Sequence, residues 1–179
     1  GGQTLNPYDL TRYPGGSSGG TGAALAANFG VVGLGTDTGG SIRVPSAFNS
    51  LVGIRPTIGL ASRDGIVPLA LTQDVGGPMA RTVEDAAIVL DVISGYDPSD
   101  VATARSVGEI PASYTSFLDK DGLQGARIGV VRALFGENEE VVSVVDTAVE
   151  DMKKMGATVI DVEIPNLDEI LSYPSLSTW

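Results

Sequence analysis

Hydrophobic positions recur along the chain with two periods, one typical of helices and one typical of strands. An Ala-rich run predicts a helix over residues 21–29, and apolar residues at helical spacing predict another over residues 83–93. A glycine after each, Gly30 and Gly95, is expected to end it. Pro45 predicts the start of a further short helix. Short apolar runs between turn residues predict strands in the same region, at residues 31–34 and 51–54.

The segment at residues 57–80 is predicted to be rich in loops, with turns at Gly59, Gly65, Pro68, Gly76, Gly77 and Pro78. After it, Thr82 and Asp85 have the spacing of a capping box, which predicts the start of the helix that follows. Residues 96–125 predict a surface connection, with one short helix near residues 113–119.

The pattern is clearest over residues 126–164, where a strand, a helix and a strand follow one another with short joints. The two strands are expected at residues 126–132 and 157–164. The helix, residues 139–155, carries an apolar stripe and ends at Gly156. This order predicts a βαβ unit with parallel strands and a right-handed crossover. We therefore expect an α/β fold, in which a mixed, largely parallel sheet is flanked by helices.

Composition narrows the classes of function. The 179 residues contain no Cys and no His, which excludes a disulfide framework, a thiol nucleophile, a Cys or His metal site and a Ser-His-Asp triad within them. A net charge of -11 argues against direct contact with nucleic acid, which requires a basic surface. Hydrophobic residues make up 42% of the chain, too many for disorder, and no apolar run reaches the length of a membrane span. We expect no cofactor and no metal.

Glycine and charge are unevenly distributed along the chain. Residues 1–60 hold more than half of the 24 glycines and are nearly neutral, whereas the remainder carries all of the excess acid. Low charge with many glycines predicts closely packed backbone or a cradle for a ligand. Two glycine-rich turns in this part each carry a serine, Ser17 within residues 15–20 and Ser41 at the end of residues 35–41.

Ser17 and Ser41 are 24 residues apart, which allows a helix, a turn and a returning strand to bring them together. Glycines beside each serine let successive N–H groups form a nest for an anion. A nest next to a hydroxyl supplies the nucleophile and the oxyanion hole that acyl transfer requires. Three other interpretations remain open: a flexible linker at residues 15–20, a phosphate loop at residues 35–41, and a structural role for both sets of glycines.

Five segments together resemble the signature of the amidase signature family. They are Gly-Gly-Ser-Ser-Gly-Gly at 15–20, Gly-Leu-Gly-Thr-Asp-Thr-Gly-Gly-Ser-Ile-Arg at 33–43, Pro-Ser-Ala-Phe at 45–48, Gly-Ile-Arg-Pro-Thr at 53–57 and Gly-Pro-Met-Ala-Arg-Thr-Val-Glu-Asp at 77–85. The resemblance is strong over residues 5–98 and weaker over residues 126–164. It implies that residues 1–179 are the central portion of a single amidase signature domain, with the signature core in residues 1–98.

The resemblance implies a Ser-Ser-Lys hydrolase that cleaves amide bonds through a serine acyl-enzyme. Ser41 matches the family's nucleophile. Ser17 matches the serine that bridges nucleophile and lysine and that follows a cis peptide bond in the family. Thr38, Gly39 and Gly40 match positions whose backbone N–H groups, with that of Ser41, form the oxyanion hole.

The resemblance also implies polar residues that support the two serines. Ser18, Asp37 and Arg43 match these positions. Asp37 and Arg43 are equally well placed to form an ordinary ion pair across the turn. The implied substrate is a small-molecule or peptide amide.

The family's lysine lies well before the serine motif, whereas this sequence has no lysine before Lys120. Lys120 lies in a charged turn, and Lys153 and Lys154 lie on the exposed side of a helix, so we expect none of them to act as the base. The chain begins at Gly1, without an initiator Met, and we expect it to be an internal part of a longer polypeptide. We expect the 179 residues alone to be inactive and poorly soluble without the remaining segments of that polypeptide.

Three functions are compatible with the sequence. The main interpretation is an amidase. The alternatives are the glutaminase subunit of a tRNA-dependent amidotransferase, and a catalytically inactive relative that acts as a binding module. We expect a cytoplasmic protein without a membrane span. The sequence identifies neither the substrate nor the oligomeric state, and a homo-oligomer is compatible with it.

Overall fold

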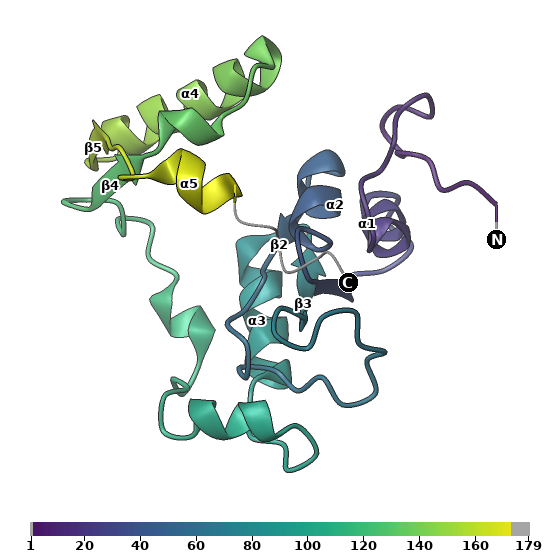
Figure 1. Cartoon of the computed structure of the whole chain (residues 1–179). Coiled ribbons are helices and arrows are strands. Elements are labelled where there is room, and N and C mark those ends of the chain that lie inside the picture. Colours follow the sequence, from purple (N-terminus) through teal and green to yellow (C-terminus); the bar gives the residue numbers. More distant parts are fainter. Residues whose placement is uncertain (1, 173–179) are drawn as a thin grey trace. The chain divides into compact units, whose positions relative to one another are not determined.

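The computed structural model describes residues 2–172 of the chain (Figure 1). These residues form two compact units, one that ends at Phe117 and one that begins at Leu118. Each unit has its own sheet and its own helices.

An antiparallel sheet of three strands organises the first unit. Its strands are β1 (Val32–Asp37), β2 (Val52–Gly53) and β3 (Val75–Ala80), in the order β1-β3-β2. The register pairs Val32 with Ala80 at one end of β1 and Asp37 with Val75 at the other. The turn that leads from β1 to Ser41 therefore leaves the sheet where β3 enters it.

The strand β3 lies in the loop-rich segment at residues 57–80, where the sequence predicts turns at Gly76, Gly77 and Pro78. Gly76, Gly77 and Pro78 resemble turn residues in the sequence, yet they form the middle of the central strand. Gly77 is required there because a Cβ would fall on the carbonyl oxygen of Ile54. Pro78 has no N–H to donate, but its carbonyl accepts the N–H of Ile54 at 3.0 Å.

Five helical segments complete the first unit: α1 (Gly19–Ala26), α2 (Arg43–Phe48), α3 (Val83–Ile93) and the 3-10 helices η1 (Val101–Ser106) and η2 (Tyr114–Phe117). The helix α3 occupies the predicted residues, and the hydroxyl of Thr82 accepts the N–H of Asp85 at 3.0 Å, so the predicted cap is confirmed. The helix α1 begins earlier than predicted, directly behind the Ser17–Ser18 pair.

The core of the first unit lies against the serine-bearing turns. Three side chains are buried together: Leu25 of α1, Met79 of β3, and Ile42, which precedes α2. Leu51 packs against them. Burial of one such side chain contributes about 1.5–3 kcal/mol to folding. Because Ile42 directly follows Ser41 in the chain and is fully buried, it anchors the serine turn to the core.

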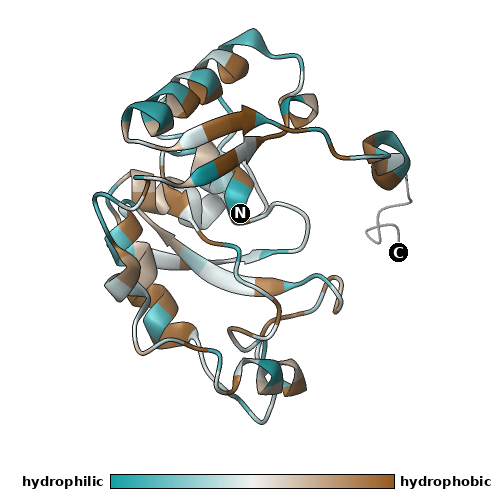
Figure 2. Cartoon of the chain, turned by 90° about the vertical axis from the view of Figure 1, so that its left-hand side faces the viewer, coloured by the Kyte–Doolittle hydropathy of each residue, from teal (hydrophilic) through white to brown (hydrophobic). Residues whose placement is uncertain are grey.

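The second unit contains β4 (Arg127–Val130), η3 (Arg132–Leu134), α4 (Glu139–Lys154), β5 (Thr158–Asp161) and α5 (Leu167–Ser172). The strands β4 and β5 pair in parallel, with α4 between them in the chain, which makes a βαβ unit. The side chain of Asn138 caps α4 by accepting the N–H groups of Glu140 and Val141 at 3.1 and 3.2 Å. Figure 2 shows hydrophilic and hydrophobic residues side by side along this long helix, as expected of an amphipathic helix that covers a sheet.

Helices and small sheets together make an α/β architecture, but only β4 and β5 meet the expectation of a largely parallel sheet. The three-stranded sheet is antiparallel. Parallel neighbours need a long crossover connection, usually a helix, and residues 54–74 between β2 and β3 form a connection without one. Within residues 2–172, no helix is both long and apolar enough to cross a membrane.

Candidate active site

Ser17 and Ser41, the serines of the two glycine-rich turns, line the same small cavity in the first unit. The cavity has a volume of about 110 Å³. Its other lining residues come from β1, the turn after it and the connection that precedes β3: Thr36, Thr38, Ile66, Val67, Leu69 and Asp74. The fold therefore brings together two hydroxyl groups that are far apart in the sequence.

Ser17 is held at the start of α1 by a backbone that packs closely on α2. The peptide bond between Gly16 and Ser17 is cis, as the family resemblance implies. Gly15 has a φ of +77°, and a Cβ there would lie 2.7 Å from the Cα of Pro45. The buried amide of Asn49 donates to the carbonyl of Pro14 at 2.6 Å and to that of Pro45 at 2.8 Å. Asn49 thus links the segment that precedes Ser17 to α2.

Ser18 links the two serine-bearing turns to each other. Its backbone N–H donates to the carbonyl of Ser41 at 3.2 Å. Its hydroxyl donates to the carbonyl of Thr36 at 3.2 Å and accepts the N–H of the same residue at 3.1 Å. Ser18 therefore connects the loop of Ser17 both to β1 and to the turn of Ser41.

Asp37 lies fully buried beneath the turn of Ser41 and accepts hydrogen bonds along it. Its carboxylate accepts the backbone N–H groups of Gly40 at 2.7 Å, Ile42 at 3.1 Å and Arg43 at 3.3 Å. Burial alone would raise the pKa of Asp37, but hydrogen bonds from Arg43 and from these N–H groups outweigh it and lower the pKa to about 2. Asp37 is therefore a carboxylate at neutral pH and fixes the turn on both sides of Ser41.

Two arginines balance the charge of Asp37. The guanidinium of Arg43 donates to both carboxylate oxygens, at 3.1 and 3.2 Å, which is the ion pair that the sequence suggested. Arg55 lies 3.3 Å from the same carboxylate and donates to the carbonyl of Gln73 at 2.8 Å. Arg55 lies in a segment that carries the family resemblance, but no role for it is predicted from the sequence, because its partners are distant along the chain.

The predicted oxyanion residues differ in how their N–H groups are engaged. The N–H of Gly40 already donates to Asp37, so it is not directed at the cavity in this structure. Within the described residues, the N–H groups of Thr38, Gly39 and Ser41 have no hydrogen-bond acceptor. An oxyanion formed at Ser41 would therefore be met by N–H groups of the turn other than that of Gly40.

A second hollow adjoins the serine cavity and shares Thr36 and Ile66 with it. Its volume is about 470 Å³, and its walls are mostly apolar. Gly35, Gly76 and Gly77 form part of the wall. The serine cavity therefore has room beside it for groups attached to a reacting carbonyl.

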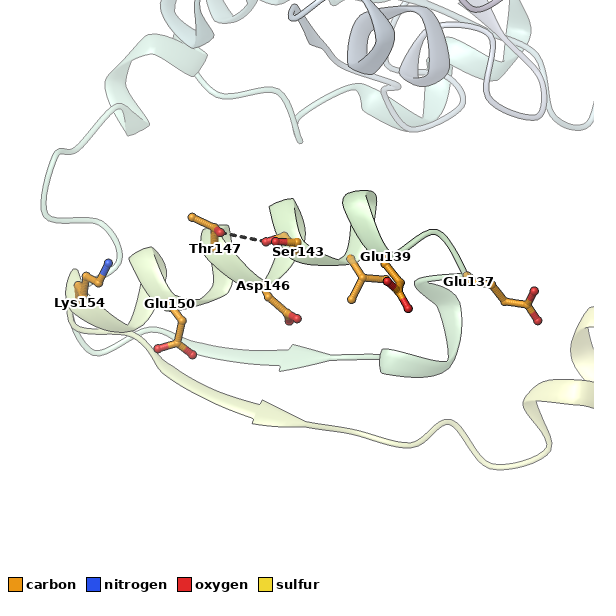
Figure 3. A pocket seen from close by; sticks show the side chains of 9 residues that line it. Glu137, Glu139, Ser143, Asp146, Thr147, Glu150 and Lys154 are labelled. Atoms are coloured by element: carbon orange, nitrogen blue, oxygen red, sulfur yellow. Dashed lines mark hydrogen bonds between the residues drawn. The ribbon is translucent and has the colours of Figure 1, made fainter.

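A wider pocket of about 750 Å³ lies along α4 in the second unit (Figure 3). Four of its nine lining residues are acidic, and the figure labels them: Glu137, Glu139, Asp146 and Glu150. It contains none of the residues predicted to carry chemistry, and its size alone does not mark a site. Among the described residues, no group of His, Cys, Asp and Glu side chains is arranged to hold a metal ion.

The lysines of the chain all lie in the second unit. Lys153 donates to Glu150 at 2.7 Å and Lys154 donates to Asp151 at 2.8 Å, both on exposed turns of α4. The hydrogen bond to Asp151 is the main cause that raises the pKa of Lys154. With its pKa raised, Lys154 is charged at neutral pH and cannot accept a proton from a serine.

Comparison with known proteins extends these observations. The family model named Amidase matches residues 1–179. The chain is 51% identical over 164 residues to the A-type subunit of glutamyl-tRNA(Gln) amidotransferase from Gloeothece citriformis, a match that covers 90% of the chain and 33% of that relative. It is 45% identical over 172 residues to the protein of the same name from Pseudomonas aeruginosa, a match that covers 95% of the chain and 35% of the relative. The chain therefore spans about a third of the length of these curated relatives.

Solved structures of two kinds resemble the chain. The peptide amidase from Stenotrophomonas maltophilia matches with a TM-score of 0.85 and 43% identity, over 94% of this chain and 35% of that one. The A-type subunit of glutamyl-tRNA(Gln) amidotransferase from Thermotoga maritima matches with a TM-score of 0.80 and 38% identity, over 93% of this chain and 36% of that one.

Proposed function

Since this chain belongs to the amidase family, we propose that it carries the nucleophilic half of an amide-hydrolysing site. One observation carries the proposal: Ser17 and Ser41 line a single cavity, although 24 residues separate them in the sequence. The substrate is an amide of a small molecule or a peptide, and Ser41 forms the acyl-enzyme with it.

In the first half of the reaction, the Oγ of Ser41 attacks the carbonyl carbon of the amide. The proton of Ser41 passes to the Oγ of Ser17, and the proton of Ser17 passes to a neutral lysine. The carbonyl oxygen becomes an oxyanion at the N–H groups of Thr38, Gly39 and Ser41. The C–N bond then breaks, and the amine leaves with the proton returned along the same route.

In the second half, water attacks the acyl-enzyme and releases the carboxylic acid and the Ser41 hydroxyl. We propose that the lysine comes from another part of the same polypeptide, because residues 1–117 contain none. The chain is then the central portion of one amidase signature domain, in which residues 1–98 are the signature core. Without that lysine, the chain in isolation is expected to be inactive.

A fluorophosphonate tests the proposal, because it phosphonylates activated serines. The full-length protein is treated with the reagent, and the adduct is located by mass spectrometry. We expect the label on Ser41, and none in the Ser41→Ala variant. The Ser99→Ala variant removes an exposed serine outside the cavity and is expected to label like the wild type. A folded wild-type protein without label on Ser41 overturns the proposal.

A second function is favoured by the names of the curated relatives. Relatives that are 45–51% identical are named as the A-type subunit of glutamyl-tRNA(Gln) amidotransferase, so a glutaminase subunit is the main alternative. In that case glutamine is the amide, and the ammonia passes to a partner. Hydrolysis of glutamine and copurification with partner subunits support this alternative, whereas an active homo-oligomer that cleaves peptide amides supports the stand-alone amidase.

A third function is a catalytically inactive relative that only binds. It predicts a folded full-length protein in which neither glutamine nor peptide amides are hydrolysed and Ser41 stays unlabelled. The cytoplasmic location stays a prediction as well, and cell fractionation with an antibody against the chain tests it.

A further inference from the structure

Asp74, which the sequence did not single out, lies directly before β3 and lines the serine cavity. The residue is 6% exposed. One carboxylate oxygen, Oδ1, accepts a hydrogen bond from the hydroxyl of Thr38. The other, Oδ2, accepts the backbone N–H groups of Leu69 and Ala70, each at 2.8 Å. The two oxygens therefore hold two different segments of the chain.

Both of these segments line the serine cavity. Thr38 belongs to the turn that carries Ser41, and Leu69 belongs to the connection between β2 and β3. The register of β1 with β3 explains the meeting, because Asp37 pairs with Val75 and the next residues out are Thr38 and Asp74. The pairing of β1 with β3 thus places the carboxylate of Asp74 beside Thr38, the first residue of the predicted oxyanion turn.

We propose that Asp74 is a positioning residue for the reaction at Ser41: it fixes the oxyanion turn through the hydroxyl of Thr38 and holds residues 66–70 against the cavity. The proposal rests on the proposed function of the site. Asp74 touches neither the reacting carbonyl nor the leaving group in this scheme. It acts by fixing where the N–H groups of the turn point when the oxyanion forms.

The chemistry of the contacts requires a carboxylate rather than a neutral acid. All three partners of Asp74 are donors, and only an ionised carboxyl accepts on both oxygens. Burial alone would raise the pKa of Asp74, but the hydrogen bonds from Thr38, Leu69 and Ala70 outweigh it and lower the pKa. An asparagine at position 74 has the same shape but only one acceptor oxygen, so it can keep only part of the three hydrogen bonds.

The test compares Asp74→Ala with Asp91→Ala in the full-length protein. Asp91 is a matched control, because it also accepts one hydroxyl, from Ser113 at 2.7 Å, and one N–H, from Tyr114 at 2.6 Å, but lies outside the cavity. We expect Asp74→Ala to lower kcat by about ten- to a hundredfold with little change in KM. We expect Asp91→Ala to leave kcat unchanged, and Asp74→Asn to give an intermediate kcat.

A double-mutant cycle tests whether Asp74 acts through Thr38. Thr38→Val removes the hydroxyl without changing the shape of the side chain, and Thr38→Ser keeps it. If the two residues act as one unit, the combination of Thr38→Val with Asp74→Ala lowers kcat no further than Asp74→Ala alone. Additive losses in kcat overturn the proposed route through Thr38. A kcat in Asp74→Ala equal to that of the wild type overturns the role altogether.

Hydrogen exchange gives a readout that does not depend on activity. We expect amide exchange over residues 36–43 to be faster in Asp74→Ala and Thr38→Val than in the wild type, and unchanged in Asp91→Ala. Unchanged exchange in both cavity variants overturns the proposal, even if the wild type proves inactive and the proposed function itself fails. If Asp74→Ala does not fold, Asp74→Asn and Thr38→Val decide the same question.

Discussion

At the scale of single residues, the turn of Ser41 depends on the buried carboxylate of Asp37. Asp37 accepts three backbone N–H groups of the turn and faces two guanidinium groups. Each hydrogen bond to a charged group contributes about 1.5–3 kcal/mol when its partners are held in place. The same side chain therefore stabilises the fold and sets the shape of the turn that the proposed reaction uses.

The Asp37→Asn substitution is expected to lower the free energy of unfolding by about 2–3 kcal/mol, because an amide replaces an acceptor-only carboxylate and leaves the arginines without a counter-charge. The Asp9→Asn variant is the control, since Asp9 is paired with Arg12 at 3.5 Å on the surface. Urea denaturation of both variants measures the difference. An equal, small effect in the two variants contradicts a special role for Asp37.

The pH dependence of stability gives a second prediction for Asp37. Its pKa is lowered from 3.8 to about 2 in the folded protein, so its ionised form stabilises the fold above pH 4. This contribution is lost as the pH falls through the folded pKa. The difference in free energy of unfolding between the wild type and Asp37→Asn should therefore shrink from pH 4 to pH 2. Urea titrations across that range measure it, and a constant difference contradicts the lowered pKa.

Whether a side-chain contact can be predicted from the sequence depends on how far apart the two residues lie along the chain. The pairing of Asp37 with Arg43 is foreseeable, because six residues of a tight turn separate them. Arg55, Asp74 and Asn49 escape prediction, because each acts on a segment that only the fold brings near: Arg55 on Gln73, Asp74 on Thr38 and Asn49 on Pro14.

At the scale of elements, the helices with local signals are predicted best. The helix α3 has its predicted bounds and its predicted Thr82 cap, and α4 begins at the predicted Glu139. Helical periodicity and caps lie within a few residues of one another, so the sequence displays them directly. The strand β3 is different, because its glycines and proline meet a requirement set by a neighbouring strand.

Position 77 in β3 has no room for a side chain. The Gly77→Ala substitution is expected to destabilise the protein by about 1–3 kcal/mol, because the new methyl group would overlap the Ile54 carbonyl. The Gly95→Ala variant is the matched control, since no atom lies within 4 Å of a Cβ at that position. Thermal unfolding of the two variants measures the difference, and equal midpoints contradict the close approach of β3 to residue 54.

At the scale of the whole molecule, the two serines of the proposed site lie in a unit that holds no lysine. Ser17, Ser41 and their supporting residues all lie in the first unit, which has no lysine in its sequence. Apolar side chains on β1 are also exposed, with Val32 41% and Leu34 56% accessible. Exposed apolar surface of this kind is normally covered by other parts of a protein. Both features agree with the comparison, in which the chain spans only 33% of the length of a curated relative.

These features lead to the prediction for the chain as a whole. The 179 residues expressed alone should hydrolyse neither peptide amides nor glutamine, and Ser41 should not react with a fluorophosphonate, because no neutral lysine activates it through Ser17. The full-length protein should do both. Its Ser41→Ala variant controls for contaminating hydrolases. Amide hydrolysis by the isolated chain that disappears in its own Ser41→Ala variant would mean that the two serines need no base from outside it.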